Sequence, residues 1–313
     1  MRALKPWVPL LGLWALTAAA EPAPGRAYYE ADPSRVGVEV LGEGPLPYSS
    51  RYAPAPSGAV LIENATVLLG DGTHFVNGDV LFDAGRIVAV GRDLAAPAEA
   101  SVVDGTGRWV TPGIIDVHSH LGDYPSPGVE AHSDGNEATA PVTARVWAEH
   151  SVWPQDPQFP LALMGGVTTL QILPGSANLV GGRGVTLKNV PARSVMDMKF
   201  PGAPHSLKMA CGENPKRVYG RRRSAPSTRM GNVAGYRESW IKARAYQAKL
   251  DAAAESGEDL PERDLEMETL AGVLRGEILI HNHCYRADEM LIMLDIAREF
   301  DYKITAFHHA TEA

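Results

Sequence analysis

The stretch that most constrains this chain is Val110–His120, an apolar run that ends in two histidines one residue apart. Its apolar residues, Ile114 and Val117 among them, do not alternate with polar ones, so the run predicts a strand buried on both faces. Side chains two residues apart on a strand point to the same side, so His118 and His120 converge. Two converging imidazoles suit a divalent metal such as zinc. The plain alternative is two unrelated core or surface histidines.

Residues 1–20 have the three-part layout of a secretory signal peptide. Arg2 and Lys5 precede an apolar run over 6–20, which is too short to span a bilayer comfortably. Small residues at 18–20 offer a cleavage site. We therefore expect an exported protein, periplasmic or secreted, that has no membrane attachment after cleavage. An uncleaved membrane anchor is the alternative.

Charge and cysteine content exclude some classes of protein. The net charge of −8 gives no reason to expect nucleic acid as a partner. Cys211 and Cys284 are too few for a disulfide framework, and the sequence leaves open whether they pair. Residues 21–57 are rich in proline, which favours an extended lead-in over a packed element.

Two patterns of secondary structure follow one another along the chain. Residues 58–112 contain short β-like runs separated by turn dipeptides such as Asp71-Gly72 and Asn77-Gly78, which predicts a small β-domain. From residue 113 onward, strand-like and helical segments alternate, which predicts an α/β fold with a parallel sheet. The strand candidates are 113–118, 167–172, 184–188, 206–210, 277–283 and 303–308. The helix candidates are 232–250, 262–275 and 287–300.

The sequence VTPGIIDVHSH at 110–120 resembles the first barrel strand of the metal-dependent amidohydrolase superfamily, most closely its imidazolonepropionase-like branch. The runs at 65–72 and 85–91 are similar to the small β-domain of that family. The resemblance implies a (β/α)8-type barrel in 113–313, with His118 and His120 as metal ligands. Such a barrel takes about 250 residues, and only six strand candidates are present. We therefore expect an incomplete barrel of about six strands.

The same resemblance implies further metal ligands near the ends of later strands. The motif H-x-x-R-A-D places one ligand at His283 and leaves His281 further back on its strand. A small residue follows the sixth-strand histidine of the family, which favours His309 over His308. Because adjacent strand residues face opposite sides, we expect at most one of these two to look into the barrel.

An oxygen ligand is also expected. Some members of the superfamily carry a carboxylated lysine that bridges two metals near the position of Lys208. A surface or substrate-facing lysine is the alternative, and Glu213 is a second candidate for an oxygen ligand. The loop over 175–184 lacks the phosphate-binding GxxxxGK[ST] pattern, so a tight connection near the barrel mouth is expected. The basic run over 216–229 suggests a solvated loop, or a guide for an anionic substrate.

These features predict a metal-dependent hydrolase that cleaves an amide or other C–N bond of a small-molecule or peptide substrate with metal-activated water. One or two divalent ions, zinc in the first place, would be the cofactor. The sequence identifies no catalytic side chain, because no residue matches the family's eighth-strand aspartate, and weak turnover is expected. The alternative is an exported metal-binding or interaction protein with little or no catalysis. A homo-oligomer is compatible with the sequence, which does not identify the substrate.

Overall fold

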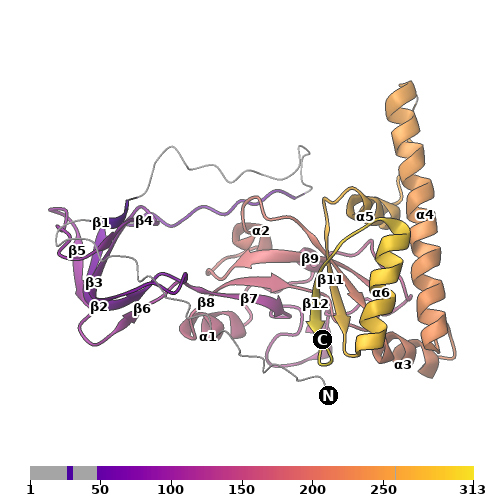
Figure 1. Ribbon diagram of the computed structural model, residues 1–313, viewed down its shortest axis with the longest axis horizontal. Coiled ribbons are helices and arrows are strands. Elements are labelled where there is room, and N and C mark those ends of the chain that lie inside the picture. Colours follow the sequence, from indigo (N-terminus) through magenta and orange to yellow (C-terminus); the bar gives the residue numbers. More distant parts are fainter. Residues whose placement is uncertain (1–26, 31–47, 258) are drawn as a thin grey trace, which may run out of the picture. The chain divides into compact units, whose positions relative to one another are not determined.

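The computed structural model describes residues 27–30, 48–257 and 259–313 (Figure 1). The signal peptide expected at 1–20 and much of the lead-in expected at 21–57 lie outside these residues. The chain divides into two compact units. The first includes Pro54–Pro112, and the second includes residues 48–53 and Gly113–Ala313. None of the helices within the described ranges is both long and apolar enough to cross a membrane.

The first unit is built on a single β-sheet with the strand order β1-β4-β3-β2-β5, and β6 pairs with β2 outside this path. Its strands are β1 (Ala27–Glu30), β2 (Val60–Leu68), β3 (His74–Asp83), β4 (Arg86–Gly91), β5 (Ser101–Asp104) and β6 (Trp109–Val110). The hairpin between β3 and β4 turns at Ala84 and Gly85, where φ is +49° and +75°. Two successive positive φ angles suit the right-handed twist of paired strands. The core consists of Ala65, Val67, Phe75, Val80 and Val90.

The second unit is α/β, as the sequence predicts, with a sheet in the order β12-β11-β10-β9-β8-β7. Its strands are β7 (Ile114–Ser119), β8 (Val167–Ile172), β9 (Val180–Lys188), β10 (Ser206–Ala210), β11 (Leu279–Cys284) and β12 (Ile304–His309). Its helices are α1 (Gln158–Met164), α2 (Val195–Met198), α3 (Glu213–Arg221), α4 (Arg229–Ser256), α5 (Leu265–Leu274) and α6 (Ala287–Phe300). Short 3-10 turns η2 (Glu130–His132) and η3 (Ala148–His150) precede α1.

The expectation of an all-parallel sheet is wrong for β9. This strand is antiparallel to both of its neighbours, β8 and β10, whereas the other neighbouring pairs in the sheet are parallel. The physical reason is the connection over 173–179, because a parallel crossover needs about a dozen residues or more. The chain therefore turns directly from β8 into a reversed strand.

The expectation that β7 is buried on both faces is also wrong. The side chains of Ile114, Ile115 and Val117 are 53%, 63% and 60% exposed. Their strand is the last one in the sheet order, so within the described residues it is paired on one side only. Its neighbour β8 has partners on both sides, and Leu170 and Ile172 there are fully buried. An apolar run alone does not distinguish an edge strand from a central one.

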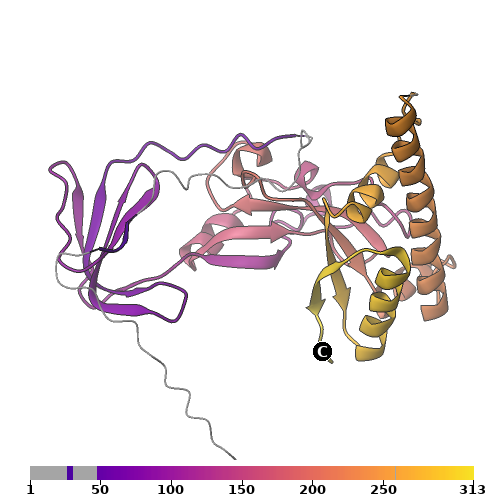
Figure 2. The ribbon, with the colours of Figure 1, turned by 45° about the horizontal axis from the view of Figure 1, so that its top comes forward.

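The main core of the second unit lies between the sheet and the helices α4, α5 and α6. Figures 1 and 2 both show α4 and α6 side by side next to β10, β11 and β12. The core includes Trp240, Leu270, Met293, Ile280 and Leu207. Helix α4 begins after Thr228, whose side chain accepts a hydrogen bond from the Gly231 amide, and ends at Gly257 in the left-handed conformation.

Candidate functional site

Basic side chains from the two edges of the second sheet meet at one place. Strands β7 and β12 stand at opposite ends of the strand order, yet Nδ1 of His118 and Nδ1 of His308 lie 2.8 Å apart. The sheet must therefore curve until its ends come together. We call the side chains gathered there the histidine cluster. Its members are His118, His120, Lys208, His281, His283, His308 and His309.

Strand register brings these residues together from distant parts of the sequence. Strand β10 pairs in parallel with β11, so that Lys208 lies opposite His281. Strand β11 pairs in parallel with β12, so that His283 lies opposite His308. Nδ1 of His281 is 2.8 Å from Nε2 of His308. The ammonium nitrogen of Lys208 is 3.4 Å from Nε2 of His118. The cluster is thus a continuous set of contacts across three strands and β7.

All five residues predicted as metal ligands lie in the cluster, together with two histidines that sequence reasoning ranked lower. His281 contacts His308, and His283 lies with its ring 4.6 Å from the ring of His309. The signal that points to His281 is its spacing from His283, because His-x-His is also the spacing of His118 and His120. Glu213, the alternative oxygen ligand, is exposed at the start of α3.

The expectation that only one of His308 and His309 faces the cluster is wrong. Their ring centroids lie 4.5 Å and 4.9 Å, respectively, from that of His118. The rule that adjacent residues face opposite sides holds only for extended backbone. His309 has φ of +69°, which lies in the left-handed region and ends the regular strand. Its ring therefore reaches the side on which His308 lies.

Burial keeps the rings of the cluster neutral. Burial is the main cause that lowers the pKa of His118 to about 2, of His283 to about 3, and of His281 and His308 to about 4. Burial also lowers the pKa of Lys208 to about 7, and this side chain is only 1% exposed. Neutral imidazoles keep a lone pair on one ring nitrogen, which is the form that binds a metal.

The donor chemistry of the cluster fits a divalent metal. Nδ1 of His283 is buried and has no hydrogen-bond partner among the described residues. Nδ1 of His120 lies 2.7 Å from the carbonyl oxygen of Leu173. A ring that donates Nδ1–H to a carbonyl leaves Nε2 as the lone-pair donor, which is the usual arrangement of a metal-ligating histidine. Imidazole nitrogens suit zinc.

The rings are not already arranged around one point. Over residues 27–30, 48–257 and 259–313, no three His, Cys, Asp or Glu side chains converge where a single ion would sit. The reason is that ring nitrogens face each other, as in the pair of His118 with His308. Binding of an ion would therefore replace hydrogen bonds between the rings.

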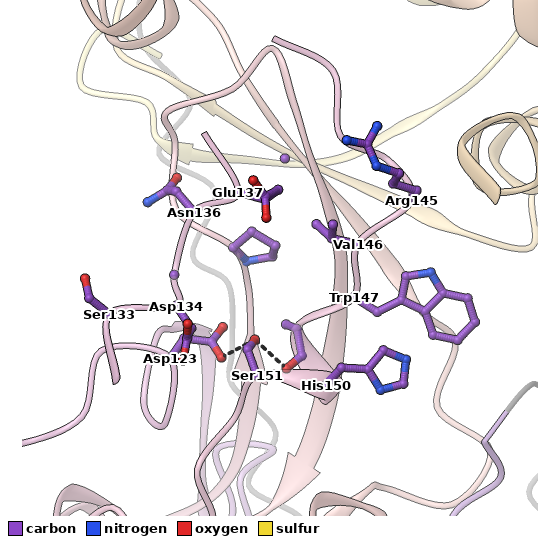
Figure 3. Close-up of a pocket in the computed structure, with 14 residues that line it drawn as sticks. Asp123, Ser133, Asp134, Asn136, Glu137, Arg145, Val146, Trp147, His150 and Ser151 are labelled. Carbon is purple, nitrogen blue, oxygen red and sulfur yellow. Dashed lines mark hydrogen bonds between the residues drawn. The ribbon is translucent and has the colours of Figure 1, made fainter. Parts of the chain in front are cut away.

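A cavity of about 560 Å³ adjoins the cluster (Figure 3). Pro174 is part of its wall, and the carbonyl oxygen of Pro174 accepts a hydrogen bond of 3.0 Å from Lys208. Acidic side chains of Asp123, Asp134 and Glu137 also line it. Burial raises the pKa of Asp123 to about 8, although the Ser151 hydroxyl donates a hydrogen bond of 2.9 Å to its carboxylate.

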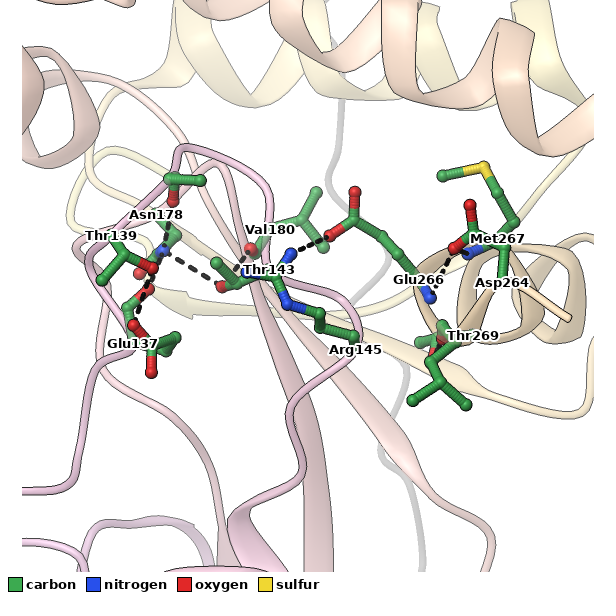
Figure 4. Close-up of polar contacts among 12 residues, drawn as sticks. Glu137, Thr139, Thr143, Arg145, Asn178, Val180, Asp264, Glu266, Met267 and Thr269 are labelled. Carbon is green, nitrogen blue, oxygen red and sulfur yellow. Dashed lines mark hydrogen bonds and ion pairs between the residues drawn. The ribbon is translucent and has the colours of Figure 1, made fainter.

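Hydrogen bonds hold the loop that forms one wall of this cavity (Figure 4). The amide of Asn178 donates to the carbonyl oxygen of Glu137 and to the Thr143 hydroxyl, at 2.8 and 3.1 Å. Arg145 reaches Glu266 at the start of α5, with 3.4 Å between Nη1 and Oε2. Because the segment that leads into β9 and helix α5 both anchor this loop, the acidic wall has a defined position.

A second buried polar group lies in the same unit, and we call it the charged triad. It consists of Glu149, Lys199 and His205, each about 3% exposed. Oε2 of Glu149 lies 2.5 Å from Nζ of Lys199 and 3.1 Å from Nε2 of His205. Burial opposes the ionisation of Glu149, but hydrogen bonds from His205 and Lys199 outweigh it and lower the pKa. No sequence motif identified this group.

Cys211 and Cys284 form a disulfide, which answers the question that the sequence left open. Their Cα atoms are 5.2 Å apart. Cys211 directly follows β10, and Cys284 directly follows His283 in β11. The bond therefore ties together two strands that carry members of the histidine cluster.

Comparisons with known proteins give several relatives, although no protein-family model matches the chain. The chain is 36% identical over 300 residues to the amidohydrolase tasK of Hapsidospora irregularis, a match that covers 85% of the chain and 30% of the relative. The crystal structure of an amidohydrolase from Thermotoga maritima aligns with a TM-score of 0.74 and 42% identity, over 78% of the chain and 63% of that protein. A dihydroorotase of Geotalea daltonii is 52% identical over 56 residues, which are 18% of the chain and 12% of the relative. The chain thus spans less than two thirds of the length of each of these relatives.

Proposed function

The chain belongs to the metal-dependent amidohydrolase superfamily, and from this premise we propose that it hydrolyses an amide or other C–N bond of a small molecule or peptide. We further propose that the strands β7 to β12 are six strands of a (β/α)8-type barrel. The curvature that brings His118 to His308 supports a barrel. Among the described residues β7 pairs with β8 only, so its other edge can pair with a further strand.

The observation that carries the proposal is the position of the histidine cluster. Its members lie at or near the carboxyl ends of parallel strands, where the active sites of β/α barrels are found. We propose that the cluster holds one or two divalent ions, with zinc as the expected metal. The proposed ligands are His118, His120, Lys208, His283 and His309. His281 and His308 are the other two histidines of the cluster and could also contact the ions.

A divalent metal, when bound, would lower the pKa of a water molecule and polarise a carbonyl group. The residues of the chain prepare the site for it. The hydrogen bond between His120 and Leu173 fixes the orientation of that ring. The pKa of Lys208, near 7, leaves much of its amine neutral at physiological pH. A neutral amine adds to carbon dioxide with loss of a proton, and the carbamate that forms is an anionic oxygen ligand. We propose this modification for Lys208, and an unmodified lysine is the alternative.

The test is metal-dependent hydrolysis by the purified chain. Release of product from a panel of small amides and dipeptides is expected with zinc, and its loss is expected after chelation and in the variant His118→Ala. The variant His74→Ala removes an exposed histidine of β3 and serves as the matched control. Bound zinc without turnover would instead support an exported metal-binding or interaction protein on the same scaffold. Absence of both metal and turnover would contradict the proposal.

We also propose that the protein is exported. The layout of residues 1–20 and the pairing of Cys211 with Cys284 support this, because disulfides persist mainly in oxidising compartments. The test is the N-terminal sequence of the protein recovered from the periplasm or medium, where Glu21 is the expected first residue. A protein that stays in the cytosol with Met1 retained would contradict export.

A further inference from the structure

A second, smaller cavity of about 270 Å³ lies beside the histidine cluster, because His120 forms part of its wall. Its volume is just below the roughly 300–1,000 Å³ of sites for drug-sized ligands. It therefore suits one small group of a substrate. Its wall also includes Asn136, Ser176, Asn214 and Arg217. Asn136 lines the larger cavity as well, so the two cavities are neighbours.

The charge of the smaller cavity comes from Arg217. Within the described part of the chain its wall contains no Asp or Glu, and no ion pair involves Arg217. One guanidinium nitrogen of Arg217, Nη2, donates a hydrogen bond of 3.3 Å to Oδ1 of Asn214. A guanidinium has five N–H donors in a fixed fork, so most of its donor capacity remains for a ligand.

Helix α3 places Arg217 next to the cluster. Asn214 and Arg217 are three residues apart on this helix and share a face. The amide nitrogen of the buried Asn214 lies 2.8 Å from the Ser176 hydroxyl and 3.2 Å from Nε2 of His283. A single side chain thus separates Arg217 from a proposed metal ligand. A group bound by Arg217 would lie close to the bond that the cluster is proposed to cleave.

Resting on the proposed function, we propose that the smaller cavity binds a carboxylate of the substrate, so that the preferred substrates are amides with a free carboxylate close to the C–N bond. The fork of an arginine matches a carboxylate with two parallel hydrogen bonds. The larger cavity is a poorer place for this group, because Asp134 and Glu137 in its wall repel an anion and its one arginine, Arg145, is already paired with Glu266. The smaller cavity is therefore the better place for an anion.

Equilibrium dialysis of the full chain against a mixture of N-acetyl amino acids and the matching N-acetyl amino acid amides tests the subsite. Mass spectrometry of both compartments measures how much of each probe is bound and whether any probe is hydrolysed. We expect the acids to bind roughly tenfold more tightly than the amides, which is the effect of one good interaction of about 1.4 kcal/mol. Arg217→Ala should abolish this preference, and Arg217→Lys should keep part of it. Arg221→Ala removes the same charge from an exposed position of the same helix and should leave the preference unchanged.

Several outcomes would overturn the subsite. They are no binding of either set of probes, no preference for acids, a preference that survives Arg217→Ala, and an equal loss in Arg221→Ala. Competition by inorganic phosphate that is stronger than competition by acetate would show that the group is not a carboxylate. Binding is measured apart from turnover, so the two proposals fail separately. Selective binding without hydrolysis contradicts the proposed function, and hydrolysis without selectivity contradicts the subsite.

Discussion

The charged triad and the histidine cluster both bury a lysine beside imidazole rings, and they differ in how the basic groups are balanced. In the triad, the carboxylate of Glu149 contacts both Lys199 and His205. In the cluster, no ion pair within the described ranges involves Lys208 or the histidines. A buried charge without a partner is costly, so the cluster side chains shed their protons and the pKa of Lys208 falls to about 7.

On this difference we propose a structural role for the triad and a metal-binding role for the cluster. The charges of the triad are balanced by its own members, so the triad has no need of a ligand, and loss of one member would leave a buried charge without a partner. The cluster presents neutral nitrogen donors with no internal counter-charge, so a metal cation is a suitable partner. Histidine and lysine alone do not distinguish the two groups, because both contain them, and the difference is the carboxylate of Glu149 in the triad.

The largest effect is expected for His120→Ala. We expect the affinity for zinc to fall more than the roughly 10–100-fold that loss of a mere supporting residue costs. The free energy of unfolding of the metal-free variant should stay within about 1 kcal/mol of wild type, as for an average substitution. Isothermal titration with zinc and urea unfolding measure the two quantities. His132→Ala removes a histidine of the same unit that stacks on Trp153, outside the cluster, and is the control. An unchanged zinc affinity in His120→Ala would refute the assignment.

Glu149→Gln should lower the free energy of unfolding and leave the affinity for zinc unchanged, which is the opposite of His120→Ala. It leaves Lys199 buried without its counter-charge, and breaking a buried pair costs about 3–5 kcal/mol. Urea unfolding should show this loss in the free energy of unfolding, while the folded variant keeps its affinity for zinc. Glu238→Gln alters an exposed carboxylate on α4 and should change stability by less than about 0.5 kcal/mol. If Glu149→Gln lost zinc and kept its stability, the contrast between the two groups would be reversed.

Removal of the disulfide should lower the free energy of unfolding somewhat less than Glu149→Gln does. The bond closes a loop with a sequence separation of 73, and such a cross-link stabilises by about 2–4 kcal/mol. The double variant Cys211→Ala/Cys284→Ala should therefore unfold at lower urea, and wild type in reducing buffer should match it. Such a loss would mean that a covalent bond holds the strands of the cluster, whereas ion pairs hold the triad. Equal stability with and without the bond would contradict this account.

The smallest effect concerns the pH dependence of stability. Burial lowers the pKa of His205 below its usual 6.5, against the pull of Glu149. As pH falls below 6.5, His205 takes up a proton in the unfolded chain before it does so in the folded protein. The contribution of this residue to the free energy of unfolding therefore decreases as pH falls. The cluster histidines act in the same direction. His205→Gln should therefore make the decrease below pH 6.5 slightly shallower in denaturant titrations, and a steeper decrease would show the sign to be wrong.

Local patterns in the sequence predicted the parts of this site that depend on local geometry. The spacing of His118 and His120 determines that both point to one side of a strand. The positions of His283 and His309 followed from family motifs. The triad was not predictable in this way, because Glu149, Lys199 and His205 lie far apart in sequence with no motif around them.

Two errors in the predictions also arise because local sequence patterns do not contain the information that decides the structure. Whether Ile115 is buried depends on what pairs with the other side of β7, and the run itself does not contain that information. The reach of His309 depends on its left-handed backbone conformation at the end of β12. The reversed direction of β9 has another cause, since the predicted strand began at residue 184 and β9 begins at Val180, which shortens the connection to 173–179 and excludes a parallel crossover.

We propose that the histidine cluster binds a divalent metal through its imidazoles. X-ray absorption at the zinc edge of the zinc-loaded full chain is the sharpest test of this proposal. We predict a first shell of nitrogen and oxygen at about 2.0–2.1 Å, with the outer-shell scattering of several imidazole rings. A shell of oxygen without imidazole scattering, or sulfur at about 2.3 Å, would place the metal elsewhere and contradict the account.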